Sequence, residues 1–150
     1  MSLDAAHIHL MLNHLPVVGA PLLLLLLTVG LLRGPRELVS LSLVLTLGLA
    51  LTTAAVYLTG EPAEELVEHA PWFREALVES HEGHATASLV AVLATGVLAG
   101  AAFLLRARAS IGPRLARITW VGLALSTLLL GWTAWSGGQI RHDEVRTAAG

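Results

Sequence analysis

Four long apolar stretches constrain the fold of this chain more than any other feature of its sequence. A helix needs about 20 mostly apolar residues to cross the hydrocarbon core of a bilayer. Four segments approach or reach that length, and polar turns or turns with glycine and proline separate them. We therefore expect a single all-α domain, an integral membrane four-helix bundle of up-down arrangement. Its expected spans are residues 15–32, 38–59, 85–105 and 118–136.

Composition supports a membrane protein and limits its cofactors. The chain is 55% hydrophobic and 13% charged, with a mean hydropathy of +0.71, which is unlike an ordinary soluble domain. Its net charge of −2 offers no basic face to nucleic acid. Because there is no cysteine, disulfides, thiolate-held zinc or iron–sulfur sites and a covalent c-type haem are excluded, which leaves nitrogen and oxygen ligands. Asp4 stands where a signal peptide would be basic, so we expect the first stretch to be a retained span.

The segment between the second and third apolar stretches is polar and rich in glutamate. Residues 61–83 contain seven glutamates. Apolar residues of this segment, among them Leu66, Trp72 and Leu77, are spaced to give it one apolar side. We therefore expect a short amphipathic helix on the membrane surface between the second and third spans.

The arginines predict the orientation, because short loops rich in arginine stay in the cytoplasm. The loops after the first and third spans contain six of the nine arginines, namely Arg33, Arg36, Arg106, Arg108, Arg114 and Arg117. The other side has the remaining three arginines and ten of the eleven acidic residues. We therefore expect a multi-pass protein of the bacterial inner membrane with both termini outside.

All seven histidines fall on the predicted outer side. Counting about 20 residues outward from the inner-edge arginines places His14 and His84 at matching depths. By the same count, His81 and His142 lie about one helical turn farther out. This segregation predicts a cofactor or metal site at the outer end of the bundle.

His9 and His14 cannot both point into the bundle from one continuous helix. Five residues along a helix rotate the side chain by about 140°. The two rings could converge only if a helix begins between them, and Pro16 fits the first turn of such a helix. For His7 and His9 we favour a simpler interpretation, in which an interfacial histidine hydrogen-bonds to headgroups or to backbone.

Two further motifs carry candidate ligands. His81 and His84 are three residues apart and share one face of a helix. This spacing is one residue short of the zinc-protease motif H-E-x-x-H, so a metalloprotease is not predicted. Near the C-terminus, the paired glycines Gly137 and Gly138 would let a backbone or a flat ligand approach closely. Arg141 could pair with a carboxylate such as a haem propionate.

Four motifs together carry a resemblance. They read H-L-P-V-V-G from His14, T-G-E-P-A-E-E from Thr59, H-E at His81 and G-G-Q-I-R-H from Gly137. The set resembles the motifs of a family of small, largely uncharacterised bacterial four-helix membrane proteins, over nearly the whole chain. The resemblance implies the four-span topology and no established activity. The residues it singles out are His14, His81, Glu82 and His142, with Glu61, Glu65 and Glu68 behind them.

The first functional prediction is a b-type haem subunit for electron transfer. Two neutral imidazoles from different helices commonly hold haem in a bundle without cysteine. His14 would be one axial ligand and His81 or His84 the other, where the resemblance favours His81 and the depth favours His84. Arg74 or Arg141 would lie near the propionates. The partners would be other membrane or periplasmic redox subunits of a larger respiratory or photosynthetic complex.

Two alternatives stay open. His14, His81 and His142 with Glu82 or Glu68 would make a mixed nitrogen–oxygen site for copper, zinc or iron. A cofactor-free structural or accessory subunit would use its histidines for interfacial hydrogen bonds and its acidic loop for docking. Transport is disfavoured because no charged residue lies inside a predicted span. The sequence leaves the oligomeric state open, and also whether the protein is an enzyme.

Overall fold

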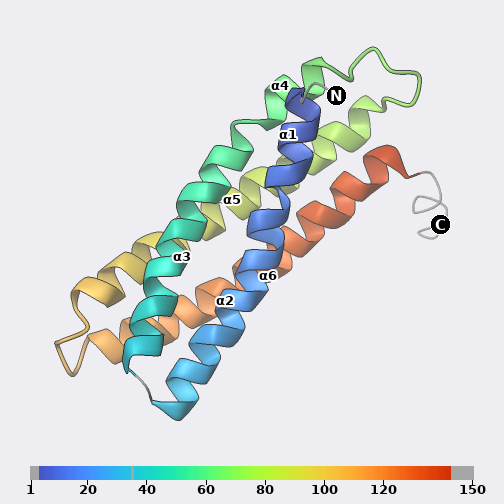
Figure 1. Ribbon diagram of the computed structural model, residues 1–150. Helices are drawn as coiled ribbons and strands as arrows, with labels where there is room; N and C mark the ends of the chain where they lie inside the picture. The colour runs from blue at the N-terminus through green and yellow to red at the C-terminus, as the bar shows by residue number, and fades with distance from the viewer. Residues whose placement is uncertain (1–3, 35, 143–150) are drawn as a thin grey trace.

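The computed structural model describes residues 4–34 and 36–142, and within these ranges every regular element is a helix (Figure 1). The elements are α1 (Ala5–Leu12), α2 (His14–Arg33), α3 (Arg36–Tyr57), α4 (Gly60–Glu65), α5 (Glu75–Leu104) and α6 (Gly112–Arg141). The prediction of an all-α chain with four long helices is thereby confirmed for the described residues.

The four long helices pack side by side as a bundle. α5 packs against α3 and α6, and α2 packs against the same two helices. Figure 1 shows the connections that follow α2 and α5 at one end of the bundle, and α1, α4 and the last turns of α6 at the other. We call this second end the histidine end. It carries His7, His9, His14, His69, His81, His84 and His142.

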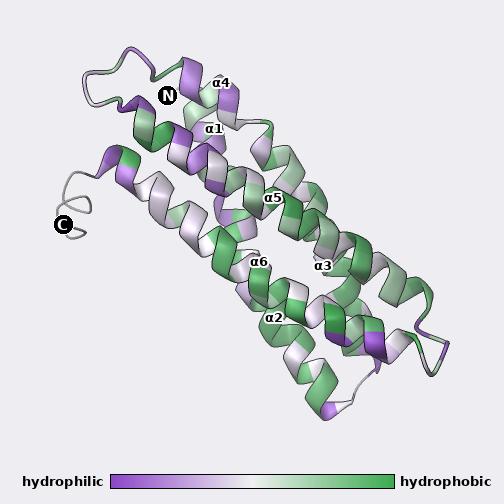
Figure 2. Cartoon of the chain, turned by 180° about the vertical axis from the view of Figure 1, so that it is seen from behind, coloured by the Kyte–Doolittle hydropathy of each residue, from purple (hydrophilic) through white to green (hydrophobic). Residues whose placement is uncertain are grey.

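Each predicted span lies within one of the long helices except for its last one or two residues in the second and third spans. Each stretch is long and apolar enough to cross a membrane. α5 begins at Glu75, ten residues before the predicted third span, because no proline interrupts the polar residues before the apolar run. Its 30 residues make a helix about 45 Å long, longer than a hydrocarbon core of about 30 Å. Figure 2 shows hydrophilic residues on α4 and the adjoining start of α5, and hydrophobic residues along the middle of the bundle.

Large apolar side chains cover the outside of the bundle. Leu22, Leu51 and Leu128 are 59%, 66% and 72% exposed. A continuous apolar exterior of this kind is typical of a surface that contacts lipid.

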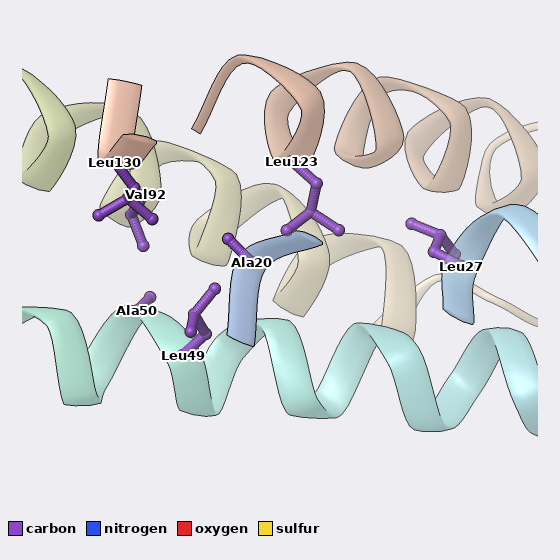
Figure 3. Packing of buried hydrophobic residues seen from close by; sticks show 7 residues of the cluster. All are labelled: Ala20, Leu27, Leu49, Ala50, Val92, Leu123 and Leu130. Carbon is purple, nitrogen blue, oxygen red and sulfur yellow. The ribbon is translucent and has the colours of Figure 1, made fainter. Parts of the chain in front are cut away.

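Small and hydroxyl-bearing residues fill much of the inside. Figure 3 shows a buried apolar cluster to which α2, α3, α5 and α6 all contribute. The buried polar residues are all serine or threonine: Ser42, Thr46, Thr53, Ser88, Thr95, Thr119, Ser126 and Ser136. Gly96 allows α5 to approach α3, because a Cβ there would lie 2.5 Å from the Cβ of Ala50.

A single turn residue, Asn13, separates α1 from α2, and its backbone angles remain helical (φ −63°, ψ −22°). The carboxylate of Asp4 caps α1 by accepting a 2.9 Å hydrogen bond from the backbone N–H of His7, and this bond lowers the pKa of Asp4. Pro16 lies in the first turn of α2, where its missing N–H costs little. A helix therefore begins between His9 and His14, which is the condition under which both rings could approach one site.

The predicted surface helix is short. α4 has six residues and follows α3 after Leu58 and Thr59. Turns then lead from Leu66 to Arg74, where α5 begins.

Candidate functional site

The ring of His81 is held between α5 and α6. It is half-buried, and its Nδ1 lies 3.0 Å from the carbonyl oxygen of Thr133 and 3.2 Å from the hydroxyl oxygen of Ser136. A carbonyl oxygen only accepts hydrogen bonds, so Nδ1 carries the proton. The Ser136 hydroxyl donates to the same carbonyl at 3.0 Å, which leaves its oxygen free to accept. Nε2 therefore keeps a lone pair, and a hydrogen bond of this kind from Nδ1 fixes the ring orientation of many metal-binding histidines.

Gly137 makes room for this ring. A Cβ at position 137 would lie 2.9 Å from Cε1 of His81 and 3.2 Å from its Nδ1, whereas a Cβ at Gly138 would meet nothing within 4 Å. The close approach expected at the paired glycines is thus present at Gly137, and the group that approaches is the His81 ring. Any larger residue at 137 would displace it.

The ring of His9 is held in a similar way by the end of α3. Its Nδ1 lies 2.8 Å from Oγ1 of Thr59. The Thr59 hydroxyl has one hydrogen, and a 2.6 Å bond to the carbonyl oxygen of Val56 uses it. The Thr59 oxygen therefore accepts from His9, Nδ1 carries the proton, and Nε2 keeps its lone pair. His9 and His81 also lie close enough for a charge on one ring to repel a charge on the other.

His14 and His142, two other predicted ligands, are both exposed. His14 is the first residue of α2, and its Nδ1 donates a 2.7 Å hydrogen bond to the carbonyl of Leu10 in the preceding helix. Its tautomer is thereby fixed as well, but its ring lies on the surface. His142 follows the last residue of α6.

His84 faces a different direction from His81. Its ring lies 5.5 Å from the ring of Trp132, at an interplanar angle of 48°. Its Nδ1 is buried and has no hydrogen-bond partner among the described residues. An open groove of about 250 Å³ lies beside it, lined by His84, Ala87, Leu129 and Trp132. A buried unpaired nitrogen costs about 1–3 kcal/mol, so this ring is less well held than His81.

Carboxylates of α4 and α5 lie together at the histidine end. Glu64 on α4 lies close to Glu82 on α5. Burial, followed by repulsion from Glu82, raises the pKa of Glu64, which lies beyond the apolar part of α3. Glu68, predicted as a ligand, instead lies 3.2 Å from Nδ1 of its neighbour His69, and both side chains are exposed. The sequence had not distinguished Glu64 from the other glutamates.

The two candidate propionate partners differ in their contacts. The guanidinium of Arg141 lies 4.2 Å above the ring of Trp72, so it ties the loop before α5 to the end of α6. Arg74 is exposed and precedes the first residue of α5. A cation above an aromatic face can still donate hydrogen bonds from its edge.

Within residues 4–34 and 36–142 there is no group of three or more histidine, aspartate or glutamate side chains arranged to hold a metal ion. The predicted set of His14, His81 and His142 with Glu82 or Glu68 is accordingly not assembled there. Haem requires only two axial ligands from the protein, so this finding does not bear on a histidine pair.

Comparison of the chain with protein-family models, with curated proteins and with solved structures finds no match. The resemblance to small bacterial four-helix membrane proteins therefore stays a prediction.

Proposed function

We propose that this protein spans the bacterial inner membrane as an up-down four-helix bundle, with its histidine end and both termini outside. The support is the apolar exterior of four helices that are each long enough to cross a bilayer. Arg33 at the end of α2 and Arg106 after α5 belong to the opposite end, as the positive-inside rule expects for the cytoplasmic side. Its first partner is the lipid bilayer.

We further propose that the histidine end binds b-type haem and that the protein is an electron-transfer subunit. The observation that carries this proposal is the ring of His81, whose Nδ1–H is bound to the carbonyl of Thr133 and whose Nε2 is left with a lone pair. When bound, haem supplies an iron that reversibly takes up and releases one electron.

The donor groups at this end fit haem. A neutral imidazole on a helix of a bundle is a usual axial ligand in a protein without cysteine. The hydrogen bond from His81 to Thr133 makes the imidazole more basic and keeps the ring from rotating. Arg141 and Arg74 are the cations at this end that could pair with propionates.

An electron-transfer subunit requires redox partners. We propose that these are other membrane or periplasmic redox subunits of a respiratory or photosynthetic complex. Exposed carboxylates at the histidine end, among them Glu61, Glu65 and Glu79, would steer a positively charged partner toward it.

A transition-metal ion is the second candidate, because His14 and His9 share the fixed Nδ1–H tautomer of His81. Imidazole nitrogens with nearby carboxylates suit copper, zinc or iron. A cofactor-free accessory subunit is the third, in which the hydrogen bonds of these rings serve only to hold helix ends together.

Optical spectroscopy of the purified protein tests these functions. Protein expressed with a haem precursor, purified in mild detergent and then titrated with haem should show a Soret band and a sharp α-band on reduction. His81→Ala should abolish both bands. His69→Ala is the matched control, because the His69 side chain is 89% exposed and should not affect the spectrum.

The other outcomes separate the alternatives. A colourless protein that holds one equivalent of copper, zinc or iron, lost in His81→Ala, would show that the site binds a metal ion instead of haem. A protein that takes up neither haem nor metal would overturn both proposals and leave the accessory subunit.

A further inference from the structure

The proposed haem site needs a second ligand besides His81, and the structure offers three histidines for that position. They are His9 on α1, His14 at the start of α2 and His84 on α5. A good axial ligand keeps Nε2 deprotonated, has its ring orientation fixed through Nδ1, and is partly enclosed by the protein near the first ligand. These three criteria separate the candidates.

His84 and His14 each fail one of the criteria. The Nδ1 of His84 is buried and without a partner among the described residues, so nothing on the protein fixes its tautomer, and its ring packs against Trp132. The ring of His14 has a fixed tautomer, but it is exposed and is bound to the carbonyl of Leu10, four residues earlier in the chain.

His9 meets all three criteria. Its Nδ1 donates to Thr59, whose own hydrogen is used by Val56, so Nε2 keeps its lone pair. Its ring is half-buried. It also lies within electrostatic reach of His81.

The fold explains how a residue so near the N-terminus reaches this position. α1 lies directly before α2, with only Asn13 between them, and it packs against α4 as well as α2. A Cβ at Gly60, the first residue of α4, would lie 3.9 Å from Cε1 of His9, so α4 forms one side of the space around the ring.

We infer that His9 and His81 are the two histidines that would hold the haem iron, through Nε2 of each ring, with their Nδ1–H groups bound by Thr59 and by Thr133. This assignment rests on the proposed haem function and replaces His14 as the second ligand. A haem held in this way would join α1 to α5, two elements that the chain separates by more than 60 residues.

The test compares His9→Ala and His14→Ala with the unaltered protein, all titrated with haem in detergent. The spectrum and the electron paramagnetic resonance signal distinguish six-coordinate low-spin iron from five-coordinate high-spin iron. We expect His14→Ala to keep the low-spin signals. We expect His9→Ala to lose them, and added imidazole to restore them. Circular dichroism of both variants checks that the helices are retained.

Thr59→Val is a second variant that leaves His9 in place. It removes the acceptor of the Nδ1–H bond, and we expect haem binding about 10- to 100-fold weaker, as is found when the hydrogen-bond partner of a metal-binding histidine is removed. Thr52→Val is the matched control, because the exposed Thr52 hydroxyl bonds only to its own helix, at 3.0 Å from the carbonyl oxygens of Gly48 and Leu49.

The possible failures are distinguishable. If the unaltered protein takes up no haem, the proposed function fails and the ligand pair fails with it. If haem binds and the low-spin signals survive His9→Ala but are lost in His14→Ala or His84→Ala, the function stands and the assignment of His9 is wrong. Loss of haem from Thr52→Val as well as Thr59→Val would show that the threonine effect is not specific to the ring of His9.

Discussion

The middle and the histidine end of the bundle use the same kind of residue for different purposes. In the middle, Thr95 of α5 meets Ser126 of α6 at 3.3 Å, and Thr95 also bonds to the carbonyl of Ala91 in its own helix. At the histidine end, Thr133 and Ser136 of α6 give a carbonyl and a hydroxyl to the ring of His81. In one region the polar groups satisfy each other, and in the other they hold an imidazole with a free lone pair.

This difference in hydrogen bonding indicates which polar side chains contribute to packing and which could contribute to function. Self-satisfied hydroxyls allow helices to approach closely and contribute to packing alone. Backbone and hydroxyl acceptors beside a ring select its tautomer, and a ring with a fixed tautomer is suited to bind a metal or haem iron. Changes in the middle should therefore alter stability, and changes at the histidine end should alter cofactor binding.

The largest expected effect comes from the middle. Gly96→Val would force a side chain onto Ala50, since even a Cβ there lies 2.5 Å from the Ala50 Cβ. We expect the free energy of unfolding in detergent to fall by about 1–3 kcal/mol or more through overpacking. Gly48→Val is the control, because a Cβ at Gly48 meets nothing within 4 Å. The amount of haem bound per folded molecule should not change. A loss of haem in Gly96→Val would contradict the proposed separation between a packing region and a binding region.

Gly137→Ala should have the corresponding effect at the histidine end. The added methyl group would lie 2.9 Å from Cε1 of His81, so the ring must move away from Thr133. We expect haem affinity to fall about 10-fold or more, with a smaller change in unfolding temperature. Gly138→Ala, which meets nothing within 4 Å, should bind haem normally. Equal affinities of the two variants would contradict the assigned role of Gly137.

Ser88→Ala tests whether a residue between the two regions contributes to stability or to haem binding. The Ser88 hydroxyl lies 2.8 Å from Oγ1 of Thr133, the residue whose carbonyl holds His81. An interhelical hydrogen bond in a membrane protein contributes about 0.6 kcal/mol on average, and we expect a loss of that size in thermal unfolding. The exposed Ser80→Ala should have no effect. A shift in the haem midpoint potential of Ser88→Ala would place Ser88 with the histidine end.

The smallest expected effect concerns Glu64 and depends on pH. Because burial and Glu82 raise the pKa of Glu64 in the folded protein, ionising it destabilises the fold above that pKa, and the destabilisation disappears as the pH falls through it. Glu64→Gln should therefore raise the unfolding temperature slightly at pH 8 and leave it unchanged at pH 4. The exposed Glu79→Gln is the control. A gain that is equal at both pH values would show that charge is not the cause.

The sequence predicted the four long helices, but hydropathy alone does not give their ends. A helix that contacts lipid must be apolar over the thickness of the hydrocarbon core, so the number and order of such helices can be read from hydropathy. α5 begins at Glu75, ten residues before the predicted third span, because a helix continues through polar residues when no proline stops it.

The site was predicted less completely, because it depends on contacts between residues far apart in the chain. His81 was predicted as a ligand, and a close approach was predicted at the paired glycines. The sequence did not indicate that the group approaching Gly137 is the ring of His81. His9 was interpreted as a simple interfacial histidine. Its hydrogen bond to Thr59 joins residues 50 positions apart, and no local sequence pattern predicts such a bond. The signal that pointed to it was the possible helix start between His9 and His14.

The position of α1 has a mechanical consequence. Asn13 keeps helical backbone angles, so α1 stays coupled to the first turn of α2. The bond between His9 and Thr59 couples the same helix to the residue before α4. A displacement of the acidic loop side of the bundle would therefore be passed through the eight residues of α1 to the first span.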